Sequence, residues 1–265
     1  MNKYKLRQLA NKCLRGNFIR LYSFFRDYVT DIIYDTKITY SLNTEIGANL
    51  FYHGEFEKKE LELCKKYIRN DSVVLDVGAN IGLHSIYFSK LASAGMVYSF
   101  EPSRHTYRQL LKNISGIDNI LPLNFAVSDS TQIADFYVAD DDAYSSLKDT
   151  KRKSIRRKQK VFCYETDEFL KTFKIEWIDF IKIDVEGLEQ KVLEGLQEVI
   201  GISNPVIFCE IYHGENSNAD PDETVKFLIE KGYKAFVLQG DCVVEYSRHN
   251  DDFYNYLFLP SVKIS

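Results

Sequence analysis

Acidic residues stand at the ends of four predicted strands, where their side chains could act together. Asp76 is the last residue but one of the run VVLDV, Glu101 closes MVYSFE, Asp184 follows IDFIKI and Glu210 follows VIFC. Apolar strands of this kind form parallel sheets, which bind ligands beyond the carboxyl ends of their strands. Carboxylates accept hydrogen bonds from ammonium and hydroxyl groups. The pattern therefore predicts a cleft for a ligand that carries such groups.

The stretch VVLDVGANIGLHS, residues 73–85, predicts a strand, a turn and a helix at which the backbone meets a ligand. Gly78 and Gly82 lack Cβ, so the chain can turn sharply and a ligand can approach closely. The helix expected to begin near Asn80 directs free N–H groups at the same place, which favours a carboxylate or another polar group there. The dinucleotide fingerprint GxGxxG is absent, and Asp76 would repel a pyrophosphate. An amino acid joined to a nucleoside meets these demands.

The next two strand ends predict contacts to that nucleoside. Glu101 is placed to accept hydrogen bonds from both hydroxyls of a ribose, and Ser103 follows it in the same turn. Ala126 and Val127 are expected to lie along the plane of an adenine, and Asp129 to accept a hydrogen bond from its exocyclic amine. A nucleoside with free 2′- and 3′-hydroxyls, joined to an amino acid, fits S-adenosylmethionine, which we predict as the cofactor.

Alternating apolar strands and helices predict an α/β fold in which a parallel sheet is covered on both faces. The strands are expected at residues 73–77, 96–101, 120–127, 177–185 and 205–212, and the helices at 57–68, 80–92, 103–114 and 187–200. Two more strands, at 233–239 and 255–260, are expected to end the chain as an antiparallel pair. An insertion at about 129–165 contains a short strand at 133–138.

These pieces together resemble the FkbM-type branch of the class I S-adenosylmethionine-dependent methyltransferases. The resemblance runs over about residues 52–259 and rests on DVGANIG, FEP, NFAVSD and IDFIKIDVEGLEQKVLEG, of which KIDVEG is the most specific part. It implies a doubly wound, Rossmann-like sheet of seven mostly parallel strands in the order 3-2-1-4-5-7-6, with the seventh strand antiparallel. It also implies O-methylation of a hydroxyl on a sugar, a glycan or a secondary metabolite.

The resemblance divides the chain into two parts. Residues 1–50 lie before it and are expected to form a helical extension or cap, because apolar residues recur at helical spacing as far as Ile32. Residues 51–265 form the expected methyltransferase domain with its insertion. The N-terminal helices could pack on the domain, lie on an anionic membrane surface, or pair two copies into a dimer.

Methyl transfer to a hydroxyl needs aligned reactants and a group that takes the proton. Asp184 is the first candidate for contact with the methionine part of the cofactor or with the acceptor. Glu210 is the second, because a carboxylate in a central strand needs a partner or a cleft. Glu186 and His213 are further catalytic candidates, although Glu186 could simply cap a helix and His213 could be exposed in a polar loop. His84 is expected to pack or cap.

Other functions are weighed against methyl transfer. A nicotinamide-dependent oxidoreductase on a similar fold is disfavoured by the missing fingerprint. A non-catalytic module that binds an anion through its basic run is the second alternative. No metal is expected, because the spacing of the carboxylates matches no metal motif and few histidines are near them.

The charge and the cysteine content of the chain limit which partners and which cell compartment are expected. The net charge of −4 gives no general case for nucleic acid. One run, Lys151–Lys160, has seven basic residues in ten and could hold an anionic acceptor, or be a solvated loop. It lacks the interleaved aromatic residues of a nucleic-acid site. The five cysteines form no CxxC pair, and lysines and arginines interrupt the apolar residues of the N-terminus. A cytoplasmic location is therefore expected.

Overall fold

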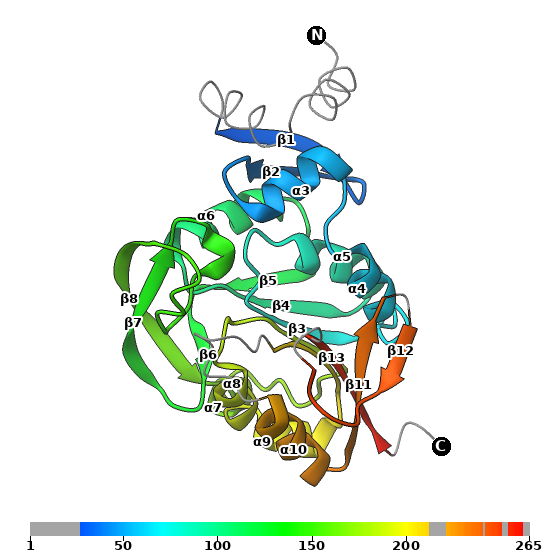
Figure 1. Cartoon of the computed structure of the whole chain (residues 1–265). Coiled ribbons are helices and arrows are strands. Elements are labelled where there is room, and N and C mark those ends of the chain that lie inside the picture. Colours follow the sequence, from blue (N-terminus) through cyan, green and yellow to red (C-terminus); the bar gives the residue numbers. More distant parts are fainter. Residues whose placement is uncertain (1–26, 212–220, 241, 251–253, 262–265) are drawn as a thin grey trace.

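The structure is a computed structural model that describes residues 27–211, 221–240, 242–250 and 254–261. Its centre is a sheet of eight strands in the order β12-β11-β13-β10-β9-β3-β4-β5 (Figure 1). The strands are β3 (Val73–Val77), β4 (Met96–Phe100), β5 (Ile120–Leu123), β9 (Phe180–Ile183), β10 (Val206–Glu210), β11 (Tyr233–Gln239), β12 (Cys242–Glu245) and β13 (Asn255–Pro260).

The order of the strands confirms the expected class I methyltransferase topology. Strands β5, β4, β3, β9 and β10 are parallel, and β13 lies antiparallel between β10 and β11. Without β12, this is the order 3-2-1-4-5-7-6. Strand β12 adds an eighth, edge strand, which pairs with β11 through a hairpin.

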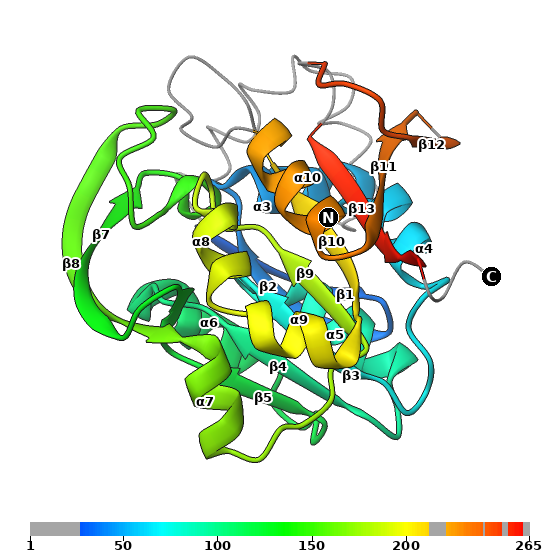
Figure 2. The same cartoon turned by 90° about the horizontal axis from the view of Figure 1, so that it is seen from below.

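Helices cover the sheet on both faces (Figures 1 and 2). On one face lie α3 (Glu45–His53), α4 (Lys58–Cys64), α5 (Leu83–Leu91) and α6 (Arg104–Asn113), and on the other α7 (Thr166–Thr172), α8 (Glu189–Glu194), α9 (Gln197–Ser203) and α10 (Pro221–Glu230). Successive strand residues feed the two hydrophobic cores: Phe180 and Phe208 join the first, and Ile181 and Ile207 the second. This alternation explains why the central strands are apolar along their whole length.

The N-terminal part of the described chain is a β-hairpin, which corrects the expected helix at Tyr28 and Ile32. Strand β1 (Tyr28–Ile33) pairs antiparallel with β2 (Thr36–Ser41). Tyr28 and Ile32 are exposed, whereas Val29 and Ile33 are buried. Residues four apart share a face in a strand, because its side chains alternate with a period of two. They also share a face in a helix, because one helical turn takes about 3.6 residues. The rest of the predicted N-terminal helices, residues 1–26, lies outside the described residues.

The insertion folds as a second, three-stranded sheet, visible as the long curved hairpin at the left of Figure 2. Its strands are β6 (Ala126–Ser128), β7 (Gln132–Ala139) and β8 (Ile155–Glu165), with β8 in the middle. A short 3-10 turn, Asp142–Tyr144, lies between β7 and β8. The strand expected at 120–127 is therefore two strands in two sheets, and half of the basic run belongs to β8 rather than to a loop.

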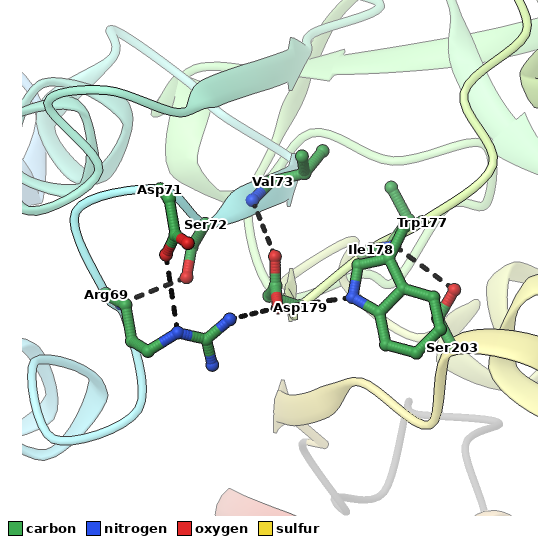
Figure 3. A network of polar contacts seen from close by, with 8 residues as sticks. All are labelled: Arg69, Asp71, Ser72, Val73, Trp177, Ile178, Asp179 and Ser203. Atoms are coloured by element: carbon green, nitrogen blue, oxygen red, sulfur yellow. Dashed lines mark hydrogen bonds and ion pairs between the residues drawn. The ribbon is translucent and has the colours of Figure 1, made fainter.

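A buried carboxylate joins the amino ends of the two central strands (Figure 3). Asp179 Oδ2 accepts a hydrogen bond from Val73 N at 2.9 Å, and Oδ1 accepts one from Arg69 Nη2 at 2.9 Å. Trp177 Nε1 donates to the same Oδ1 at 3.3 Å. The contacts fix β3 beside β9 at the edge of the sheet opposite to the predicted ligand site. Among the described helices, none combines the length and apolar character needed to cross a membrane.

Candidate active site

Two adjoining cavities open at the carboxyl ends of β3, β4, β9 and β10. The narrow cavity, about 60 Å³, is lined by Glu101, Phe125, Ala126, Val127, Phe136 and Leu188 among others. The wide cavity, about 340 Å³, is lined by side chains from α4, α5, β9 and β10. Gly78, Asn80, Ala143, Asp184 and Glu186 line both. The predicted cleft is therefore present as two connected compartments that meet at the glycine turn.

The glycine turn holds the two compartments together through its backbone. Gly78 has a φ of +86°, and a Cβ placed there would lie 1.8 Å from the carbonyl oxygen of Asp184. Gly78 N and Ala79 N both donate to the carbonyl oxygen of Phe100. Gly78 is thus required first by the chain itself, since neighbouring backbone segments approach where a side chain would stand.

The helix after the turn begins later than expected. Helix α5 starts at Leu83 with Gly82 as its N-cap, so the expected start near Asn80 is wrong. Asn80 instead takes the left-handed conformation, with a φ of +49°, and its N–H donates to Glu101 Oε2 at 3.0 Å. Gly82 lies against Leu110 of α6 and does not line either cavity.

Glu101 is a buried polar residue that lines the narrow cavity. Its Oε2 accepts the hydrogen bond from Asn80, and its Oε1 accepts one from Ser103 N at 2.7 Å. Burial raises the pKa of Glu101 to about 8, although the two N–H groups oppose the shift. Ser103 is buried behind it and bonds to Thr106, so its own side chain does not line the cavity.

One part of the narrow cavity's lining is apolar, while Asn80, Asp142, Ser145, Asp184 and Glu186 add further polar groups to it. Phe125, Ala126, Val127 and Leu188 supply flat and branched surfaces around a slot. Ala126 and Val127 therefore lie where an adenine was expected. An apolar surface next to several carboxyl groups is typical of a nucleoside site, in which apolar walls hold the base and a few polar groups orient it.

Asp76 and Asp129 are placed differently from the sequence-based expectation. Asp76 is fully buried, accepts a hydrogen bond from Ser85 Oγ at 2.5 Å and lines neither cavity. Its side chain points to the α5 side of β3 because alternate strand residues face opposite sides of the sheet. Asp129 lies beyond the slot and pairs with Lys191 at 3.2 Å. Neither carboxylate is in place to contact a ligand in the cavities.

Asp184 and Lys182 form a buried ion pair at the floor of the wide cavity. Lys182 is 3% exposed, and its Nζ donates to Asp184 Oδ2 at 2.9 Å. Burial alone would lower the pKa of Lys182, but Asp184, Asp76 and Glu57 hold it above its usual value. The ammonium therefore stays charged and can only donate hydrogen bonds. Lysine inside the apolar run IDFIKIDV was the sequence signal for this group.

Glu186 is a cavity residue rather than a helix cap. It has a φ of +59°, and its carboxylate pairs with Arg152. Helix α8 begins at Glu189, whose own Oε1 accepts the hydrogen bond from Gly187 N. Burial and the neighbouring Asp184 raise the pKa of Glu186 to about 8.

Glu210 reaches the wide cavity from the end of β10. Within the described part of the chain its carboxyl group makes no hydrogen bond or ion pair. Burial, followed by the charges of Asp184, Glu57 and Glu186, raises its pKa well above the usual range. The protonated form of Glu210 is therefore favoured, and a protonated carboxyl group can both donate and accept hydrogen bonds with a polar ligand. The candidate His213 lies outside the described residues.

Most of the basic run does not face the cavities. Lys160 pairs with Asp135, Arg156 pairs with Asp142, and Lys158 lies over the ring of Tyr137. Arg152 alone among the basic residues of the run lines the wide cavity. An anion clamp built from the whole run is therefore not formed.

Two further residues of the wide cavity come from segments to which no role in catalysis was assigned. Glu57 precedes α4, and His84 lies in the first turn of α5. His84 Nε2 is 3.0 Å from Glu57 Oε2. Nothing local in the sequence pairs these two residues. In the residues that the structure covers, no group of three or more His, Cys, Asp or Glu side chains could hold a metal ion.

A family model places this geometry among known proteins. The model of the FkbM methyltransferase domain matches residues 76–235, which include the glycine turn, Glu101, Asp184 and Glu210. The chain belongs to the FkbM methyltransferase family. The expected family and the expected class of enzyme are thus confirmed, and the oxidoreductase and the non-catalytic module find no support.

Individual FkbM relatives are distant. The chain is 28% identical over 175 residues to the hexuronic acid methyltransferase AglP of Haloferax volcanii. The alignment covers 66% of this chain and 68% of that protein. It is 24% identical over 144 residues to the 2-O-methyltransferase NoeI of Sinorhizobium fredii, in an alignment that covers 49% of this chain and 59% of that protein. A crystal structure of an FkbM methyltransferase from Methylobacillus flagellatus shares the fold, with a TM-score of 0.50 and 16% identity. That alignment covers 80% of this chain and 52% of the other, so the chain spans about half the length of this solved relative.

Proposed function

We propose that the protein transfers a methyl group from S-adenosylmethionine to a hydroxyl group of a sugar, a glycan or a similar small metabolite. The observation that carries this proposal is Glu101, a buried carboxyl group that lines the narrow cavity together with the apolar surface of Phe125, Ala126 and Val127. The slot joins a second cavity large enough for an acceptor. The names of AglP and NoeI, a hexuronic acid methyltransferase and a 2-O-methyltransferase, support an acceptor of the sugar class.

The residues of the narrow cavity fit the proposed cofactor. Glu101 would accept hydrogen bonds from the ribose hydroxyls, and the slot formed by Phe125, Ala126 and Val127 would hold the adenine. Asn80 and Asp184, at the junction of the cavities, would face the amino-acid part. When bound, S-adenosylmethionine supplies a methyl group on a positively charged sulfur.

The wide cavity suits a hydroxyl-bearing acceptor. Glu210, whose protonated form is favoured by its surroundings, can donate and accept hydrogen bonds with sugar hydroxyls, and the Lys182–Asp184 pair also lines this cavity. Arg152 is the group best placed to approach an acidic sugar, but Glu186 already pairs with it. We therefore favour a neutral hydroxyl-rich acceptor over one bound mainly through the basic run.

The cysteines bear on the cell compartment in which the protein acts. Cys64, Cys163, Cys209 and Cys242 are free thiols, which fits a reducing compartment such as the cytoplasm. Membrane contact and dimerisation through the N-terminal segment stay predictions, because residues 1–26 lie outside the described chain.

Calorimetric titration with S-adenosylhomocysteine and with NAD tests the cofactor. We expect saturable binding of the first and none of the second. Glu101→Gln should weaken binding of S-adenosylhomocysteine about 5- to 100-fold, because the amide nitrogen cannot accept the hydrogen bonds that a carboxyl oxygen accepts, and a buried donor left unpaired costs about 1–3 kcal/mol. The matched control is Asp129→Asn, a carboxylate at a neighbouring strand end that lies outside the slot. Equal loss in both variants, or binding of NAD, would refute the proposed site.

Methyl transfer itself is tested by mass spectrometry. The protein is incubated with S-adenosylmethionine and a panel of hexose, hexuronic acid and hexosamine glycosides. A mass increase of one methylene on a glycoside, absent in the Glu101→Gln variant at low cofactor concentration, is the expected result.

A further inference from the structure

Glu57 takes a left-handed backbone conformation, which residues other than glycine seldom adopt. It precedes α4 with a φ of +48° and a ψ of +43°, in the left-handed region, and its side chain makes no capping hydrogen bond to the helix. A residue other than glycine in this region costs about 1–2 kcal/mol. Strained residues of this kind are concentrated at functional sites. The conformation directs attention to what the Glu57 side chain contacts instead.

The Glu57 carboxylate lies beside the imidazole ring of His84 in the lining of the wide cavity. Its Oε2 lies 3.0 Å from Nε2 of His84, and both residues line the cavity. The His84 ring is largely buried and packs against Phe88, with the ring centroids 5.8 Å apart. Burial alone would raise the pKa of Glu57, but the contact with His84 and the charge of Lys182 lower it. The carboxylate is therefore ionised at neutral pH.

The contact with Glu57 leaves the other ring nitrogen of His84 for a ligand. In the described structure, Nδ1 of His84 has no hydrogen-bond partner. Nε2 lies within ion-pair distance of Glu57, although the contact lacks the geometry of a hydrogen bond in the structure. A carboxylate beside Nε2 favours the tautomer with the proton on that nitrogen, which leaves Nδ1 unprotonated. Such a nitrogen can accept a proton from a hydroxyl group in the cavity.

The other ionisable groups of the wide cavity are less suited to that task. Lys182 is held charged and has no lone pair to accept a proton, and burial with the neighbouring carboxylates favours the protonated form of Glu210. Asp184 is bound by Lys182, and Glu186 by Arg152. Glu60, which lies on α4, is engaged as well, because its Oε1 accepts a hydrogen bond from Asn255 Nδ2.

We propose that His84 takes the proton from the acceptor hydroxyl and that Glu57 positions its ring. The inference rests on the proposed methyl transfer. The O–H bond breaks as its proton moves to Nδ1. The hydroxyl oxygen bonds to the methyl carbon while the carbon–sulfur bond breaks with its electron pair left on sulfur. The imidazolium formed is stabilised by the Glu57 carboxylate, and its extra proton later passes to water.

The first experiment compares turnover and cofactor binding in histidine variants. His84→Gln should lower kcat by about 10²–10⁴-fold, the usual contribution of a positioned base, and leave the affinity for S-adenosylhomocysteine within about twofold. Intact affinity also shows that the variant is folded. Free imidazole should restore part of the rate in His84→Ala. The matched control is His53→Gln on α3, which lies outside the wide cavity and should change nothing. A His84→Gln variant with unchanged kcat would overturn the proposal.

The second experiment separates positioning from simple packing. The groups that face the pair are Glu60 from α4, Lys182 and Asp184 from the end of β9, and Glu210 from β10. Removing the negative charge in Glu57→Gln makes the charged ring less favourable, so the acid limb of the kcat–pH curve should shift to lower pH. The maximal rate should fall, and Glu57→Asp should recover part of it. A curve with an unchanged acid limb would refute the role of Glu57.

A third measurement needs no acceptor and separates this inference from the proposed function. With ¹³C-labelled histidine, the NMR titration of His84 in the resting protein should move to lower pH in Glu57→Gln. If it does not move, the pair is not formed and the inference fails. If it moves but no glycoside is methylated by the wild-type protein, the pairing holds and the proposed function is what fails.

Discussion

At the scale of single residues, Gly78 shows that one position can meet two demands. The sequence suggested that a glycine here admits a ligand, and the residue does line both cavities. The structure adds that the backbone of Asp184 lies where its side chain would stand. Through this contact the glycine turn sets the position of Asp184, the first candidate for contact with the reactants.

Replacing Gly78 therefore tests this contact directly. Gly78→Ala would place Cβ 1.8 Å from the Asp184 carbonyl oxygen, so the backbone of β3 or β9 must move. We expect the free energy of unfolding to fall by more than about 3 kcal/mol and binding of S-adenosylhomocysteine to be lost. Gly116→Ala is the matched control, with a similar φ of +85° and no atom within 4 Å of the added Cβ.

The control isolates the cost of the left-handed conformation. Gly116→Ala should cost about 1–2 kcal/mol and leave cofactor affinity unchanged. Urea denaturation and calorimetry measure the two quantities. Similar losses in the two variants would show that the contact with Asp184 is not important.

At the scale of elements, the two ends of the central strands have different tasks. The carboxyl ends of β3 and β9 carry the cavities, whereas their amino ends are joined by Asp179 (Figure 3). Both edges present carboxylates, so the residue type alone does not separate a structural site from a functional one. The partners do: Asp179 is satisfied by three donors from within the fold.

Substitution of Asp179 should affect stability without affecting the site. Asp179→Ala leaves the N–H of Val73 unpaired and removes the partner of Arg69, which should cost about 2 kcal/mol and lower Tm by about 4–8 °C. Asp71→Ala removes only an exposed partner of the same arginine and should change stability by less than about 1 kcal/mol. Affinity for S-adenosylhomocysteine should be unchanged in both folded variants. A large loss of affinity in Asp179→Ala would contradict the division between the two edges.

At the scale of the whole molecule, the cleft and the start of helix α8 beside it hold carboxyl groups whose protonated form burial favours. The pKa of Glu101 is raised to about 8, that of Glu186 to about 8 and that of Glu189 to about 7, in each case chiefly by burial. In the unfolded chain such groups ionise near pH 4.3. Between these limits the folded state holds more protons than the unfolded state, so stability falls as pH rises.

The stability of the protein should therefore be lower at pH 9 than at pH 6. Each of these groups contributes stability below its unfolded pKa that is lost as pH rises through the folded value. Urea denaturation at several pH values measures the slope, which should be smaller in Glu101→Gln because one of the titrating groups is gone. A free energy of unfolding that rises from pH 6 to pH 9, or an equal slope in the variant, would contradict this account.

The sequence by itself determined the fold, the family and the edge of the sheet at which the cavities open. Strand periodicity, the glycine turn and the acidic strand ends are local features, so Glu101, Asp184 and Glu210 could be placed without coordinates. Periodicity did not separate a strand from a helix at Tyr28 and Ile32, because residues spaced by four share a face in both.

Only the tertiary structure decided which carboxylates face the cleft. Asp76 turns into the protein and Asp129 pairs with Lys191, although both stand near predicted strand ends. The direction of a side chain depends on strand register and on what packs against it, and neither is local. The same holds for Glu57 and His84, which belong to different helical segments and meet because both segments pack on one face of the sheet.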